Sequence, residues 1–187
     1  MANIDISALA PDRRAMGSFC ILPDSKYIYQ EEDEQLVLLL RAHPITQLMW
    51  IANTVFGVIF HVFILGWLGS IINQGVWTIL FVFGFFLIFA YAWYNFILWY
   101  YNLGLVTNKR IVDIDYFGIS KRVTTEARIA KIADATAKVR GFFGQIFNYG
   151  EITVKTDGPI QNIEYDEVPD PELAVSIINA LVGQAVR

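Results

Sequence analysis

This chain of 187 residues contains one cysteine and two histidines, and its residues of catalytic types form no recognisable catalytic motif in the sequence. Cys20 is the single cysteine, which excludes an intramolecular disulfide and a cysteine-based metal site. The acidic run of residues 31–34 is the densest group of metal-ligand types, but consecutive carboxylates of this kind are more typical of a solvated turn. No glycine-rich phosphate loop and no nucleophile beside a base occur. We therefore expect a protein that is not an enzyme, with no metal and no cofactor.

Basic residues are concentrated after a long uncharged segment. Residues 102–141 contain eight Lys or Arg and four Asp or Glu, whereas residues 142–187 contain two and seven. Basic side chains near an anionic membrane each contribute about 1 kcal/mol of attraction. The candidate anionic-lipid contacts are Lys109, Arg110, Lys121, Arg122 and Arg128. These residues are explained equally well as a solvated face that sets membrane topology. The acidic residues 142–187 argue against nucleic acid as a partner.

The uncharged segment indicates an integral membrane protein. Hydrophobic residues make up 55% of the chain and the mean hydropathy is +0.43, above the usual range of soluble proteins. Residues 45–101 contain no Asp, Glu, Lys or Arg. Roughly 20 apolar residues span a bilayer as a helix, so two spans fit, at 45–69 and 76–101, with a short turn between them. We expect a two-helix transmembrane hairpin inserted in the lipid bilayer.

The basic residues that flank the hairpin predict its orientation. Arg41 precedes the first helix, Lys109 and Arg110 follow the second, and the connecting loop has no basic residue. Because basic residues favour the cytoplasmic side, both termini are expected in the cytoplasm of a multi-pass protein of the cell membrane. Tryptophan and tyrosine favour the headgroup level, so Trp67 and Trp77 are expected at the outer interface.

Polar residues within the predicted spans need partners. Asn53, Gly57 and His61 share one face of the first helix, because they recur every four residues. Gly84, Ile88 and Asn95 share a face of the second. We expect these faces to pack together, with Asn53, His61 and Asn95 as the polar contacts of the hairpin. A proton or ion path through His61 is the alternative, and the absence of an acidic residue in the spans argues against it.

A small α+β soluble domain is predicted outside the hairpin. Residues 1–30 have no clear periodicity and are expected to be loosely ordered. Within residues 31–44, an apolar run from Leu36 predicts a buried strand that packs on the domain formed by residues 102–187. That domain alternates polar and apolar residues between turns, which predicts antiparallel strands. Asp170 and Pro171 suit the start of a C-terminal helix that we expect to end near Gly183.

Two segments of this domain permit more than one interpretation. Residues 126–140 contain five alanines, which favour helix by propensity, although they build no clear helical stripe and lie among strands. Residues 140–149 carry aromatic and aliphatic side chains at helical spacing, which predicts a short helix. These side chains are Phe142, Phe143, Ile146 and Phe147. We expect them to pack in the core, and contact with the membrane surface is the alternative.

Several of these runs resemble the bacterial pleckstrin-homology (PH) domain of small membrane proteins. The resemblance is carried by residues 107–112, by Ile129 and Ile132, by residues 141–152, and by a Glu-containing apolar strand that ends in His43-Pro44 before the hairpin. It covers roughly residues 31–182. It implies a PH-like fold, a partly open antiparallel β-barrel capped by a C-terminal helix, and a strand within residues 126–139. It implies no catalytic residues.

Two functions therefore follow as expectations. The first is a membrane-anchored, non-catalytic interaction or scaffold module that presents a PH-like domain at the cytoplasmic face and binds protein partners or forms a homo-oligomer. Exposed strand edges would accept a partner by strand addition. The alternative is recognition of anionic lipid headgroups by the basic half of the domain. An enzyme or a transporter is disfavoured.

Overall fold

The computed structural model describes residues 17–23, 31, 33–118, 120–157 and 162–185. Most of the segment that we predict to be loosely ordered, residues 1–30, lies outside these ranges. The chain divides into two compact units, one formed by residues 1–44 with 100–187 and the other by residues 45–99. Each unit is described by itself below.

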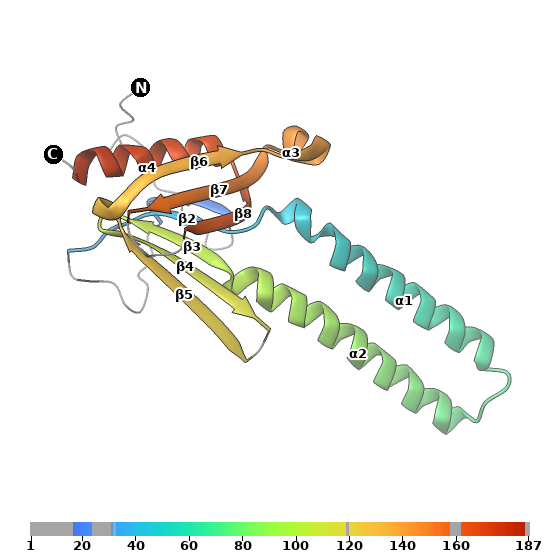
Figure 1. The fold of residues 1–187 in the computed structure, drawn as a ribbon. Coiled ribbons are helices and arrows are strands. Elements are labelled where there is room, and N and C mark those ends of the chain that lie inside the picture. Colours follow the sequence, from blue (N-terminus) through green and yellow to red (C-terminus); the bar gives the residue numbers. More distant parts are fainter. Residues whose placement is uncertain (1–16, 24–30, 32, 119, 158–161, 186–187) are drawn as a thin grey trace. The chain divides into compact units, whose positions relative to one another are not determined.

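The first unit contains strands, short helices and one longer helix, labelled in Figure 1. Its strands are β1 (Phe19–Ile21), β2 (Leu36–Leu40), β3 (Leu103–Thr107), β4 (Arg110–Phe117), β5 (Lys121–Arg128), β6 (Ile132–Lys138), β7 (Tyr149–Thr156) and β8 (Ile163–Pro169). Its helices are the 3₁₀ turn η3 (Ile129–Lys131), α3 (Gly141–Phe147) and α4 (Pro171–Ala185).

The strands form two antiparallel sheets. One has the order β1-β2-β3-β4-β5 and the other the order β6-β7-β8. Strand β2 pairs directly with β3, with Leu40 opposite Gly104, although the whole second unit lies between them in the sequence. The apolar run from Leu36 is therefore a strand of this sheet.

The predicted barrel is corrected to two separate sheets. Strands β5 and β6 are consecutive but belong to different sheets, because the turn η3 interrupts the chain between them. The alanine-rich stretch of residues 126–140 contains the end of β5, the turn η3 and the strand β6, so it includes a strand, as the resemblance implied and against its helix propensity. The pairing of β6 with β7 and its contacts with α4 override that propensity.

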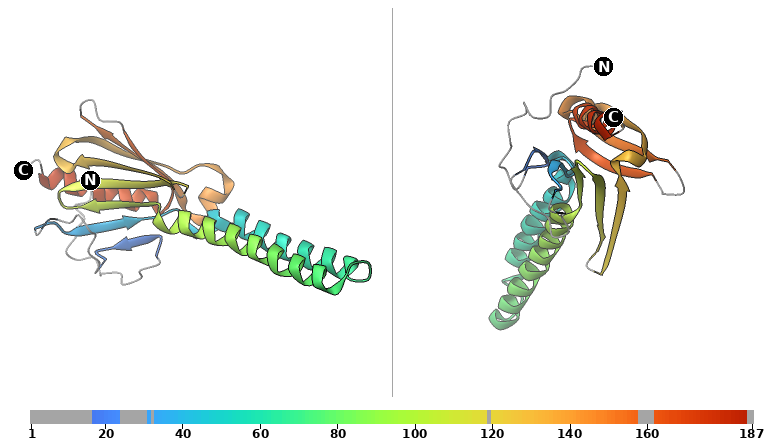
Figure 2. Two further views of the ribbon diagram at one scale, coloured as in Figure 1. Left: turned by 90° about the horizontal axis from the view of Figure 1, so that it is seen from below. Right: turned by 90° about the vertical axis from the view of Figure 1, so that its left-hand side faces the viewer.

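Helix α4 covers the smaller sheet. It lies along β6 and β7, as the two views in Figure 2 show, and it buries Ala174, Ile177 and Ile178 there. These side chains join a cluster that also contains Leu38 and Val106 of the larger sheet. The helix continues beyond Gly183 to Ala185, slightly further than the sequence predicts.

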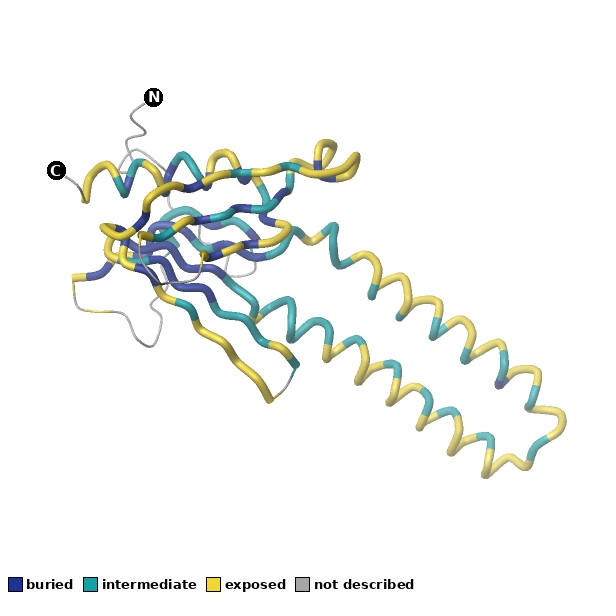
Figure 3. Tube along the Cα trace, in the orientation of Figure 1, coloured by how far each residue is buried: buried dark blue, intermediate teal, exposed yellow. Residues whose placement is uncertain are grey.

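The second unit is a helical hairpin. A 3₁₀ turn, η2 (Pro44–Gln47), leads into α1 (Leu48–Leu68), and α2 (Gln74–Tyr101) follows a short connection. Both helices are long and apolar enough to cross a membrane, and many of their large apolar side chains are exposed. Most residues of both helices are exposed and are yellow in Figure 3. Asn73 caps the second helix, because its side-chain oxygen accepts a hydrogen bond from the Gly75 N–H at 2.8 Å.

Candidate functional site

A buried carboxylate joins the segment before β2 to the turn between β3 and β4. The Glu34 side chain is fully covered, and both of its oxygens bind the Arg110 guanidinium at 3.0 Å. Thr107 donates its hydroxyl to the same carboxylate at 2.7 Å. A bidentate ion pair of this kind is strong and geometrically specific. The predicted lipid contact Arg110 is therefore part of the domain's internal structure.

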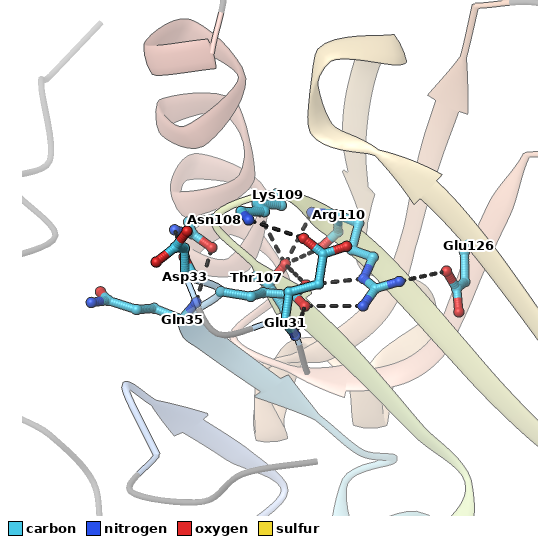
Figure 4. Close-up of polar contacts among 9 residues, drawn as sticks. Glu31, Asp33, Gln35, Thr107, Asn108, Lys109, Arg110 and Glu126 are labelled. Atoms are coloured by element: carbon cyan, nitrogen blue, oxygen red, sulfur yellow. Dashed lines mark hydrogen bonds and ion pairs between the residues drawn. The ribbon is translucent and has the colours of Figure 1, made fainter. Parts of the chain in front are cut away.

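This network forms one wall of an open hollow. Arg110 also contacts Glu126 of β5 at 3.0 Å, and Lys109 contacts Glu31 at 2.9 Å, as the dashed lines in Figure 4 mark. The hollow has a volume of about 680 Å³. It is lined by Glu31, Lys109, Arg110, Glu126, Ala127, Arg128 and Lys131. The hydrogen bond that Lys109 donates to Glu31 and the nearby acidic charges raise the pKa of Lys109, so its charge is already partly compensated.

The five predicted lipid contacts lie in two separate places. Strands β4 and β5 pair with Arg110 opposite Arg128 at one end and Phe117 opposite Lys121 at the other. With about 3.3 Å per residue, the eight residues of β4 separate these ends by roughly 20 Å. Lys109, Arg110 and Arg128 line the hollow at the first end, and Lys121 and Arg122 lie at the second.

The second end lies next to the point where the chain returns from the helices. The side chain of Asn102, which directly follows α2, accepts a hydrogen bond from the Tyr116 N–H at 2.6 Å. The Tyr101 and Tyr116 rings are 5.8 Å apart. Lys121 and Arg122 are exposed there and lie over the Phe117 and Tyr116 rings at 5.5 and 5.8 Å. Basic and aromatic side chains are thus combined at this position.

An acidic cleft between β4 and β8 was not predicted. It has a volume of about 310 Å³, and Asp113, Asp115 and Asp166 lie along it with Glu164 and Glu167. Burial, followed by repulsion from Asp115 and Asp166, raises the pKa of Asp113 to about 7. Asp113 and Asp115 alternate along β4, a pattern visible in the sequence, but their proximity to Asp166 depends on tertiary packing.

Only some of the polar residues predicted to join the two helices lie between them. A Cβ at Gly84 would come within 2.1 Å of the His61 ring, and one at Gly57 would lie 3.8 Å from Ile88, so the two predicted faces meet. Nε2 of His61 lies 3.2 Å from the Phe81 carbonyl oxygen and donates its proton there.

The two asparagines of the hairpin are placed differently from His61. The Asn95 amide donates to the Tyr91 carbonyl of its own helix at 2.8 Å. Asn53 is exposed. The close approach of the two helices is therefore centred on His61 and Gly84.

The fold defines a class of protein: two antiparallel sheets closed by a C-terminal helix, as in PH-like domains, with an apolar helical hairpin inserted after a strand of the first sheet. The family model described as bacterial PH domain matches residues 48–181. The chain belongs to this family of bacterial PH domains, as its sequence resemblance predicts. PH domains are generally non-catalytic binding modules. No curated protein and no solved structure shows a significant match.

Proposed function

We propose that this protein is a membrane-anchored interaction module, in which α1 and α2 cross the cell membrane and hold the PH-like unit at its cytoplasmic face. The observation that carries the proposal is the insertion of the apolar hairpin between two strands, β2 and β3, that pair in one sheet. Two strands that lie on opposite sides of a bilayer cannot pair with each other. Both ends of the hairpin, and the domain attached to them, must therefore lie on one side.

The surface of the hairpin supports membrane insertion. Phe56 on α1 and Phe86 on α2 are 68% and 63% exposed, in helices that carry no charged side chain. Contiguous apolar surface of this extent is rare on soluble proteins and is stable in hydrocarbon. Arg41 and Lys109 flank the hairpin and its connecting loop has no basic residue, which supports a cytoplasmic location for both termini.

The edge of β5 supports binding of a protein partner or of a second copy of the chain. β5 is the terminal strand of its sheet in the described part of the chain, and six of its eight residues are exposed. An exposed strand edge offers unpaired backbone groups to an added strand. The hairpin raises the effective concentration of such a module for partners at the same membrane.

Sided labelling tests the anchor. In a Cys20→Ala background, a membrane-impermeant maleimide applied to intact cells should label Asn73→Cys in the connecting loop and spare Lys131→Cys in η3. After the cells are lysed, both positions should react. The chain should also remain in the membrane after alkaline carbonate extraction. Labelling of Lys131→Cys in intact cells, or extraction by carbonate, would contradict the proposed anchoring.

Photo-crosslinking tests the edge strand. A photoreactive residue at Thr124, exposed in β5, should give one adduct of defined mass in native membranes, because an added strand lies beside it. The matched control is Lys155, exposed in β7, which is paired on both sides. Equal adducts through both positions, or none through Thr124, would remove the edge-strand interaction and leave the anchor unaffected.

Recognition of anionic lipid is a second candidate, favoured by the exposure of Lys121 and Arg122 beside the chain's return from α2. Hydrogen exchange of the full chain in nanodiscs should show slower exchange at the β4–β5 turn when anionic lipid is added. Lys121→Ala with Arg122→Ala should abolish that change. Lys109→Ala with Arg128→Ala should preserve it. A change that is the same in both double variants would exclude a specific role for the basic turn.

A further inference from the structure

Helix α3 exposes the residues that a helix on a soluble domain ordinarily buries. Phe142, Phe143 and Ile146 are 72%, 63% and 56% exposed, whereas Gly144 is the residue buried in this helix. Our prediction that these side chains pack in the core is therefore wrong. The reason is local: the close approach of Gly144 to the Tyr149 carbonyl fixes which side of the helix faces the domain.

The orientation of α3 is fixed at both ends. Gly141 begins the helix with φ of +74°, and Asn148 ends it in the left-handed conformation with φ of 50°. The Asn148 side-chain amide donates to the Asp170 carboxylate, and the Asp170 N–H donates back to the Asn148 carbonyl at 2.9 Å. The exposed apolar face is therefore held in place by the segment that starts α4.

The C-terminal end of α3 lies beside His43, where the chain leaves for the helices. The His43 ring stacks on Tyr149 at 5.6 Å and lies 6.5 Å from Phe147. The His43 N–H also donates to the Glu167 carbonyl at 2.7 Å. Pro44 follows and begins the turn that leads into α1. The end of α3 therefore contacts His43, a residue that directly precedes the turn η2 in the sequence.

The composition of α3 matches a membrane interface. The helix has no ionisable side chain, and the first charged residue beside it, Arg140, has a side chain that is 64% exposed and pairs with Glu151 at 3.2 Å. Short amphipathic elements of this kind bury aromatic and aliphatic side chains about 5–10 Å into the headgroup boundary, with a basic residue at the polar edge. A lipid surface therefore accounts for both the apolar face and its place in the chain.

We infer that Phe142, Phe143 and Ile146 insert into the headgroup region of the membrane and fix the orientation of the PH-like unit against the bilayer. This inference rests on the proposed membrane insertion of the hairpin. The occupant of the α3 face is the lipid surface itself, because His43, which contacts Phe147 at the end of α3, directly precedes Pro44, where the turn into α1 begins.

Fluorescence quenching in lipid tests this inference on the full chain. In a Cys20→Ala background, an environment-sensitive fluorophore at Gln145→Cys in α3 is compared with one at Lys131→Cys, in phosphatidylcholine nanodiscs. Quenching by a lipid nitroxide placed near the glycerol end of the acyl chain is expected at position 145 and not at position 131. Phe142→Ser with Phe143→Ser should abolish the quenching, while hydrogen exchange in β7 remains unchanged.

The outcomes separate the two proposals. A fluorophore at position 145 that the nitroxide does not quench, in a chain that resists carbonate extraction, overturns the α3 contact and leaves the anchor intact. Blue-shifted emission without quenching does the same, because it means that protein covers the helix. A chain extracted by carbonate removes both the anchor and the α3 contact.

Discussion

At the scale of single residues, Glu34 illustrates how a buried charge stabilises one arrangement of the first unit. Its side chain has no exposed surface, so its charge requires partners, and Arg110, Thr107 and the Glu31 N–H supply them. Replacing a buried pair by apolar residues is often tolerated, but removing one partner leaves the other charge uncompensated.

Glu34→Gln should lower the free energy of unfolding of the PH-like unit by about 3 kcal/mol, the lower end of the range for a broken buried pair, because Arg110 keeps Glu126. Pulse proteolysis of the detergent-solubilised chain measures this, since all five tryptophans lie in residues 45–99 and would report on the hairpin. Glu31→Gln is the matched control. It removes an exposed pair and should leave stability nearly unchanged. Equal losses of stability in the two variants would contradict the structural role assigned to the buried Glu34–Arg110 pair.

Ionised Asp113, unlike ionised Glu34, destabilises the folded unit, because burial and its acidic neighbours favour its neutral form. Its pKa is about 7 in the folded chain and about 3.9 in an unfolded one. Between these values the folded state binds more protons than the unfolded state. Stability therefore falls as the pH rises from about 4 to about 7 and is level above that range.

Asp113→Asn should consequently stabilise the unit at pH 8 by at most about 4 kcal/mol, the equivalent of a shift of about three pKa units, and change little near pH 4. Hydrogen exchange of β4 and β8 at both pH values measures the effect, after correction for the pH dependence of the intrinsic exchange rate. Asp134→Asn, at an exposed position in β6, serves as the control and should show no such pH dependence. A stabilisation of the same size at pH 4 would contradict the assigned cause.

At the scale of elements, α1 and α2 contact each other at several points along the hairpin. The His61 ring occupies the space left by the missing side chain of Gly84, and the Trp77 indole donates to the Leu65 carbonyl at 2.9 Å near the connecting loop. In hydrocarbon, small residues and polar contacts of this kind are what bring helices together.

Gly84→Ala should separate α1 from α2, since the added Cβ would come within 2.1 Å of the His61 ring. We expect a cost of about 1–3 kcal/mol for overpacking. Disulfide formation between Gly57→Cys and Ile88→Cys in a Cys20→Ala background should slow accordingly. Gly66→Ala meets no atom within 4 Å and should leave the rate unchanged, while His61→Ala should restore it in the Gly84→Ala variant. Equal rates in Gly84→Ala and Gly66→Ala would rule out this contact.

The elements also show what the sequence can and cannot predict. The hairpin, β2 and α4 follow from charge distribution, apolar runs and capping residues, because these signals are local. The alanine-rich β6 needed the family resemblance, since its neighbours β7 and α4 decide its conformation. The exposed face of α3 was predicted wrongly, because helical spacing identifies an apolar stripe without identifying what covers it.

In the candidate site, too, the residue types could be predicted from the sequence, whereas their tertiary contacts could not. The basic residues were visible in the sequence, but their separation by the length of β4 depends on the register with β5. The pairing of Arg110 with Glu34 joins residues that are 76 positions apart, and the acidic cleft joins β4 to β8. Contacts over such distances carry no periodic signal in a single sequence.

At the scale of the whole molecule, the chain is a domain with a hairpin inserted between two neighbouring strands. The buried clusters of the described residues in the first unit, with Leu38, Val106 and Ile111 among their members, are drawn from outside residues 45–99. Leu40 lies opposite Gly104, so the strand ends on either side of the insertion are adjacent. The domain's packing is therefore complete without α1 and α2.

Replacing residues 44–100 by Asn-Gly should accordingly give a water-soluble, folded protein, because the remaining residues between β2 and β3 can close a short loop. Circular dichroism and hydrogen exchange should show protected β3 and β7. The fragment of residues 102–187 is the informative comparison. It lacks β2, whose Leu36, Val37, Leu38 and Leu40 are buried, and should aggregate because the edge of β3 and the core are uncovered. If the hairpin-replaced chain aggregates as the fragment does, the PH-like unit depends on α1 and α2 to fold, and the two units are not independent.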